Sequence, residues 1–86
     1  MTARPDAIAI LNPETGRRPA DELEVLLRRI LEQRYSLIIH RSTYPGEARR
    51  LAEQAATQAE LVIAVGGDGT VREVVAGILD TPATLG

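Results

Sequence analysis

The segment Gly66–Thr70 (GGDGT) holds three glycines in four residues and carries the clearest chemical signal in the sequence. It follows the apolar run Leu61–Val65 and precedes a stretch with helical spacing. Glycines let backbone N–H groups face a ligand without Cβ obstruction, and the following helix adds unpaired N–H groups and a partial positive charge. This arrangement favours phosphate. The alternative is a tight glycine turn in which Asp68 or Thr70 serves only as an N-cap.

Asp68 adds a second element to the predicted phosphate site. A carboxylate beside a polyphosphate is repelled unless a cation or a hydroxyl donor intervenes, so Asp68 indicates Mg²⁺ or a water network nearby. The segment is not the dinucleotide fingerprint GxGxxG, because Arg72 stands at the third glycine position. It is not a P-loop either, since the chain has no lysine. The lack of cysteine and the single histidine, His40, exclude cysteine-ligated metals and a histidine cluster.

Two other polar segments follow predicted strands. Asn12–Gly16 (NPETG) comes after the apolar run Ala7–Leu11, and Thr43 comes after the run Leu37–Ile39. Taken singly, the first is typical of an Asx or proline turn and the second of a helix cap. In a parallel sheet, however, every strand-to-helix loop leaves at the same edge, so these loops and the glycine turn can surround one site. The side chains expected to meet there are Asn12, Thr15, Thr43, Asp68 and Thr70.

The elements that must position these residues alternate along the chain. The three apolar runs predict strands, and those at Ala7–Leu11 and Leu61–Val65 are expected to be buried. Between and after them, three helices are predicted from apolar faces composed of Leu23, Leu26, Leu27, Ile30 and Leu31, then Ala48, Leu51, Ala52, Ala55 and Ala59, then Val71, Val74, Val75, Ile78 and Leu79. Asp21 with Glu24 predicts a capping box on the first helix, and Thr43 is a possible N-cap of the second.

The order βαβαβα predicts an α/β fold, with a parallel sheet in a three-layer arrangement. Ala83–Gly86 is expected to begin another strand, which indicates a partial domain. The third strand or its neighbour would then be an open edge, so self-association into a homo-oligomer is a secondary expectation.

Composition limits the classes of function. The chain has 86 residues with no Phe and no Trp, which predicts a lean aliphatic core. A net charge of −2 gives no general electrostatic reason to bind nucleic acid. No apolar run approaches 18 residues and no signal-peptide pattern is present, so the sequence predicts a cytoplasmic protein.

Three segments together resemble the diacylglycerol kinase catalytic domain family, which includes bacterial diacylglycerol kinase-like lipid kinases and the sphingosine and ceramide kinases. They are Asn12-Pro13-x-x-Gly16, Thr43 with Gly46-Glu47-Ala48, and Gly66–Gly77. NAD kinases and phosphofructokinases share the GGDG[TS] motif, but its continuation as TxxEVxxG and the preceding NPxxG are similar to the lipid kinases. The resemblance spans the chain and implies the N-terminal part of a NAD kinase/diacylglycerol kinase-like nucleotide-binding domain.

The resemblance implies transfer of the γ-phosphate of ATP, with Mg²⁺, to a lipid hydroxyl by a protein that acts peripherally on membranes. It implies that Asn12, Pro13, Glu14, Thr15 and Gly16 line the nucleotide, that Thr43 contacts phosphate, that Gly66, Gly67, Asp68, Gly69, Thr70, Val71 and Arg72 surround the triphosphate, and that Glu73 braces this loop. The family often has Asn at the position of Arg72, and the stretch from Thr43 to Gly46 is a residue shorter than usual.

The resemblance also implies a second, β-rich lobe that supplies the general base, most of the metal site and the lipid pocket. Residues 1–86 hold no such lobe, so no catalytic residue and no metal ligand is assigned within them. Phosphoryl transfer needs nucleophile, metal and phosphates together, and the chain alone is therefore expected to lack kinase activity. The alternatives are a NAD kinase-type enzyme of the same superfamily and a non-catalytic nucleotide- or phosphate-binding α/β module.

Overall fold

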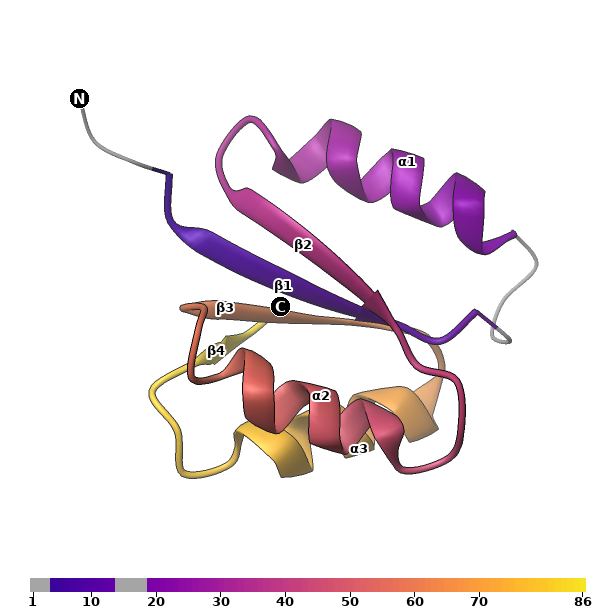
Figure 1. Cartoon of the computed structure of the whole chain (residues 1–86), viewed down its shortest axis with the longest axis vertical. Coiled ribbons are helices and arrows are strands. Elements are labelled where there is room, and N and C mark those ends of the chain that lie inside the picture. Colours follow the sequence, from indigo (N-terminus) through magenta and orange to yellow (C-terminus); the bar gives the residue numbers. More distant parts are fainter. Residues whose placement is uncertain (1–3, 14–18) are drawn as a thin grey trace.

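The computed structural model describes residues 4–13 and 19–86, and within them the strands form one parallel sheet of four strands (Figure 1). In chain order the elements are β1 (Asp6–Leu11), α1 (Ala20–Leu31), β2 (Ser36–Arg41), α2 (Glu47–Ala55), β3 (Leu61–Val65), α3 (Asp68–Ile78) and β4 (Thr84–Leu85). The strand order is β2-β1-β3-β4. This confirms the predicted α/β class and the βαβαβα order, and β4 is the fourth strand expected near the C-terminus.

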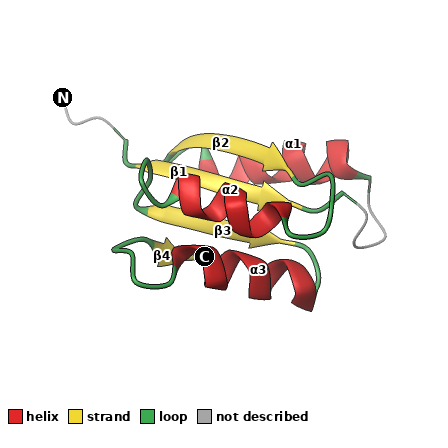
Figure 2. Cartoon of the chain, turned by 60° about the horizontal axis from the view of Figure 1, so that its bottom comes forward, coloured by secondary structure: helices red, strands yellow, loops and turns green. Residues whose placement is uncertain are grey.

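The helices lie on both faces of the sheet. α1 lies on one face, next to β2, and α2 and α3 lie side by side on the other (Figures 1 and 2). The first strand is the most enclosed, because the side chains of Ala7–Leu11 are at most 2% exposed. This burial on both faces explains why β1 is wholly apolar.

The core lies between the sheet and the pair α2 and α3. Its largest fully buried side chains are Ile8 and Ile10 of β1, Val62 of β3 and Val74 of α3. α2 contributes only alanines to the buried set, and these small side chains let α2 and α3 approach closely. Gly77 lies at this contact, where a Cβ would be 2.5 Å from the backbone oxygen of Arg49. The lean aliphatic core therefore depends on the close packing of α2 against α3.

The outer face of the sheet is covered more thinly. α1 has no fully buried residue, and Ile30, predicted to lie on its apolar face, is 64% exposed. The prediction for Ile30 is therefore wrong: α1 covers the sheet alone, and a single helix turns only part of its circumference toward the strands. Three members of the apolar face predicted for the third helix are exposed as well: Val71 and Val75 of α3, and Leu79, its C-cap residue.

The predicted helix caps are wrong as well. α1 begins after Pro19 and α2 begins after Gly46, neither with a capping side-chain hydrogen bond. Asp21 and Glu24 instead accept hydrogen bonds from Arg41 of β2, at 2.5 and 2.8 Å. These bonds raise the pKa of Arg41, with the bond to Glu24 as the largest cause. The predicted capping box is in fact a tertiary ion-pair cluster that ties α1 to the end of β2.

Candidate functional site

The turns after β1 and β3 begin side by side at the carboxyl edge of the sheet. Leu11 pairs with Val65 at the end of the two strands, and the Asn12 N–H donates to the Val65 carbonyl at 2.9 Å. The chain after β2 joins them, because the Ser42 N–H donates to the Leu11 carbonyl at 2.9 Å. Three segments that are distant in sequence therefore meet at one place, as the parallel topology predicts.

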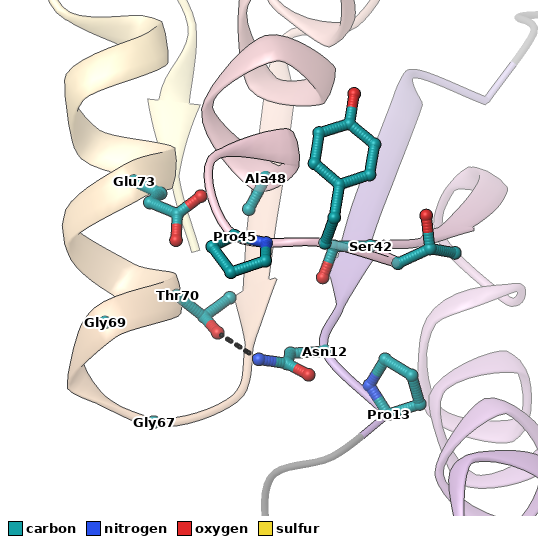
Figure 3. A pocket seen from close by; sticks show the side chains of 11 residues that line it. Asn12, Pro13, Ser42, Pro45, Ala48, Gly67, Gly69, Thr70 and Glu73 are labelled. Atoms are coloured by element: carbon teal, nitrogen blue, oxygen red, sulfur yellow. Dashed lines mark hydrogen bonds between the residues drawn. The ribbon is translucent and has the colours of Figure 1, made fainter.

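A pocket of about 530 Å³ lies where these segments meet (Figure 3). Its walls come from the turns that follow β1 and β2, the start of α2, and the glycine turn with the first turns of α3. The residues that line it are Asn12, Pro13, Ser42, Thr43, Tyr44, Pro45, Ala48, Gly67, Gly69, Thr70 and Glu73. Its volume is within the range typical of small-ligand sites.

Asn12 and Thr70 connect the first turn to the third. The Asn12 Nδ2 group donates to the Thr70 hydroxyl at 3.4 Å, and Figure 3 shows this bond across the floor of the pocket. Thr70 is only 4% exposed, so its hydroxyl group is held in place by packing. The bond is long and therefore weak, but it fixes a pair of polar groups beside the glycine turn.

The glycine turn leads directly into α3. Gly67 is the N-cap with extended backbone, and α3 begins at Asp68 without a capping side-chain hydrogen bond. The interpretation of Asp68 or Thr70 as the N-cap is therefore wrong. Because no side chain caps the turn, the first N–H groups of α3 are available to an anion at the end of the helix where the dipole is positive.

Thr43 is held by Glu47 of α2. The Glu47 Oε1 atom accepts from the Thr43 N–H at 2.6 Å and from the Thr43 hydroxyl at 2.9 Å. The Glu47 Oε2 atom pairs with Arg50 at 3.0 Å. The bond from the Thr43 N–H is the main cause that lowers the pKa of Glu47, so its carboxylate stays charged throughout the neutral range. Thr43 is thus a partner of Glu47 and not the N-cap of α2, which is Gly46.

Glu73 lies one turn into α3 with its carboxylate toward Pro45 and Ala48 of the opposite wall (Figure 3). Its Oε1 atom is buried and has no hydrogen-bond partner among the residues that the structure describes. A buried acceptor without a donor is costly, on the order of 1–3 kcal/mol. Such an atom, lining a pocket, is suited to receive a donor from a ligand or from a rearranged loop.

The structure brings together part of the set predicted from sequence. Asn12, Pro13, Thr43, Gly67, Gly69, Thr70 and Glu73 line the pocket, whereas Gly66, Asp68, Val71 and Arg72 are exposed and do not. Glu14, Thr15 and Gly16 lie outside the described residues. Sequence reasoning missed Ser42, Tyr44, Pro45 and Ala48 as lining residues, although Ser42–Pro45 directly follows a strand and could have been included on that ground.

The described residues offer few side chains to bind the Mg²⁺ expected from the sequence. Residues 4–13 and 19–86 contain no cluster of three or more His, Cys, Asp or Glu side chains suited to hold a metal ion. Asp68 is the carboxylate within the predicted phosphate turn Gly66–Thr70.

In the described part of the chain, no helix has both the length and the apolar character required to cross a bilayer.

Fold and site together define an α/β domain with a pocket, lined by both polar and apolar groups, where its strand-to-helix turns meet. Residues 6–86 match the family described as the diacylglycerol kinase catalytic domain, and the chain belongs to this family. This confirms the resemblance seen in the motifs around the pocket.

Relatives and solved structures agree with the family. The chain is 40% identical over 81 residues to the diacylglycerol kinase of Bacillus subtilis, covering 90% of this chain and 27% of that protein. It is 34% identical over 80 residues to a protein of Yersinia pestis named "Probable lipid kinase YegS-like", covering 92% of this chain and 26% of that protein. A crystal structure of a diacylglycerol kinase from Bacillus anthracis superposes with a TM-score of 0.84 at 27% identity, covering 99% of this chain and 30% of that one. The chain thus spans about a quarter of the length of these curated relatives.

Proposed function

We propose that this chain is the ATP-binding lobe of a lipid kinase, which transfers the γ-phosphate of ATP to a lipid hydroxyl. The observation that carries the proposal is the meeting of Asn12, the glycine turn and Thr70 at one pocket, in a chain of the diacylglycerol kinase catalytic domain family. Relatives named diacylglycerol kinase and lipid kinase support the acceptor class.

The pocket offers different chemistry on its two sides. The uncapped N-terminus of α3 at Gly67 supplies backbone donors, which suit the phosphates of a nucleotide. The Glu73 Oε1 atom supplies an acceptor about one and a half helical turns further along α3, which suits a hydroxyl or amino group. A nucleotide carries both kinds of group, whereas inorganic phosphate at neutral pH is chiefly an acceptor.

Mg²⁺ would be held here chiefly by phosphate oxygens and water. This cation usually keeps several waters and takes only one or two protein carboxylates at such sites. Asp68, exposed at the first residue of α3, fits the part of one such carboxylate. The ion would neutralise phosphate charge and so reduce repulsion from Asp68.

We assign the general base and the lipid pocket to protein outside these 86 residues. The pocket has no histidine or cysteine among its lining residues, and its carboxylate Glu73 is on the wall shared by α2 and α3. Residues 1–86 alone are therefore expected to bind ATP weakly and to transfer no phosphate, because positioning of both substrates is the main source of catalysis in phosphoryl transfer.

Titration of the ¹⁵N-labelled chain with Mg-ATP tests this proposal. We expect amide shifts confined to Asn12, Gly66–Thr70 and the chain after β2, with no shifts on the exposed face of α1. Adenosine and tripolyphosphate, each alone, should bind more weakly than ATP because each engages one side of the pocket. Absence of any localised shift at millimolar Mg-ATP would refute nucleotide binding by this lobe.

Replacement of Glu73 by methionine separates stability from binding. Glu73→Met is expected to raise the free energy of unfolding by about 1 kcal/mol, because it removes a buried acceptor without a donor. It is also expected to weaken Mg-ATP binding, because the acceptor is lost. Urea unfolding and the ATP titration measure the two effects. Glu53→Met is the control, because Glu53 is exposed and paired with Arg49; a less stable Glu73→Met variant would contradict the prediction.

A further inference from the structure

The wall of the pocket formed by Thr43, Tyr44 and Pro45 has few backbone anchors. At one end the Ser42 N–H bonds to the Leu11 carbonyl, and at the other the Glu47 N–H bonds to the Tyr44 carbonyl at 3.1 Å. The following Gly46 has a φ of 91°, a left-handed conformation that glycine adopts without strain. The segment between these anchors therefore depends on side-chain contacts for its position.

Glu47 supplies those contacts from outside the pocket. One carboxylate oxygen of Glu47 accepts hydrogen bonds from the Thr43 N–H and hydroxyl, and the other accepts a hydrogen bond from Arg50. The side chain of Glu47 is only 12% exposed, whereas that of Arg50 is 51% exposed. A charge-assisted bond to a largely enclosed carboxylate is stronger than an exposed surface pair, so the Thr43–Glu47 bonds hold this wall.

The engaged donors limit what Thr43 can do for a ligand. Phosphate oxygens require donors, and both Thr43 donors already face Glu47 at 2.6 and 2.9 Å. A phosphate oxygen could accept a hydrogen bond from the Thr43 hydroxyl only by displacing the Glu47 carboxylate. Thr43 in this arrangement shapes the pocket and does not donate to phosphate.

Through its ion pair, Arg50 offsets the negative charge of the Glu47 carboxylate, which lies close to the proposed phosphate site. A hydrogen bond with Tyr44, followed by the bond with Glu47, raises the pKa of Arg50, so the guanidinium stays charged. Tyr44 belongs to the same wall of the pocket.

We propose that Glu47 is a positioning residue of the nucleotide site, which fixes the Thr43–Pro45 wall through the two donors of Thr43. The inference rests on the proposed function. It assigns Glu47 a part in ligand binding although Glu47 does not line the pocket.

The test compares Glu47→Ala, Glu47→Gln and Thr43→Val by Mg-ATP titration, with Glu53→Ala as control. Glu47→Ala is expected to raise Kd about tenfold, as the loss of a charge-assisted hydrogen bond would. Glu47→Gln keeps an acceptor for Thr43 and should recover most of the affinity. Thr43→Val keeps the stronger backbone bond and should raise Kd only about threefold. Glu53 pairs with Arg49 on the same helix but does not line the pocket, so Glu53→Ala should bind as the unmodified chain.

The amide resonance of Thr43 adds a readout that does not depend on ligand. It should move upfield in Glu47→Ala and stay near its original position in Glu47→Gln. An unmodified chain that binds no Mg-ATP would refute the proposed function and this inference with it. A chain that binds, with Glu47→Ala binding equally well or Thr43→Val losing more affinity than Glu47→Ala, would overturn the inference alone. If Glu47→Ala does not fold, a Thr43→Val loss of tenfold or more overturns it and a loss near threefold supports it.

Discussion

Replacement of Gly77 by alanine is expected to destabilise the chain by about 2–3 kcal/mol, although alanine is the better helix former. The added Cβ would lie 2.5 Å from the Arg49 backbone oxygen and 2.7 Å from the Ala52 Cβ. Neither neighbour can move away by rotating a side chain, because one is backbone and the other is a methyl group. α2 and α3 would have to separate, and their contact holds much of the core.

Urea unfolding followed by far-UV circular dichroism measures this effect, with Gly69→Ala as the matched control. Gly69 lies in the same helix, and a Cβ there meets no heavy atom within 4 Å. The control should be stabilised by up to about 1 kcal/mol, because alanine favours the helix. Equal effects at the two glycines would show that helix propensity, and not the contact between α2 and α3, governs the stability of α3.

The sequence predicts the strands well because their signals are local. β1 and β3 are short apolar runs that end at polar turns. β1 is buried on both faces, as predicted, whereas in β3 only Val62 is fully buried. The same argument places the Asn12 turn beside the glycine turn, since parallel strands present their carboxyl ends at one edge. The backbone hydrogen bond from the Asn12 N–H to the Val65 carbonyl confirms that the two turns begin side by side.

The helix starts were not predictable in the same way. Asp21 and Glu24 have the spacing of a capping box, but Arg41, which they bind, is contributed by the next strand. A tertiary ion pair replaces the predicted local hydrogen bond, and the residues near the start of α1 do not indicate this pair. The sequence likewise predicts Thr43 as a cap, yet its hydroxyl donates to Glu47.

The pocket shows a similar division. Its glycine turn and Asn12 follow from motif and topology, whereas the buried orphan oxygen of Glu73 depends on how α2 faces α3. Ala48 lines the pocket because it is small and sits where α2 begins. A sequence pattern gives the spacing of such residues along one helix but not the neighbour that each will meet.

Gly69→Ala is expected to weaken Mg-ATP binding by about tenfold or more, equivalent to at least about 1.4 kcal/mol. Gly69 lines the pocket in the first turn of α3, where the proposed phosphate contacts are backbone N–H groups. Without a Cβ, the backbone can approach a ligand closely. An added methyl group would occupy space that is open in the structure and would hold phosphate away from those donors.

Titration of Gly69→Ala with Mg-ATP and with tripolyphosphate measures the loss, and Ala76→Val is the control. Ala76 is exposed on α3 and does not line the pocket, so methyl groups added there should leave affinity unchanged. Equal loss for ATP and tripolyphosphate would place the defect at the phosphates, whereas unchanged binding of both would exclude backbone contact at Gly69. Because the substitution is expected to stabilise the fold while it weakens binding, unfolding cannot account for a loss of affinity.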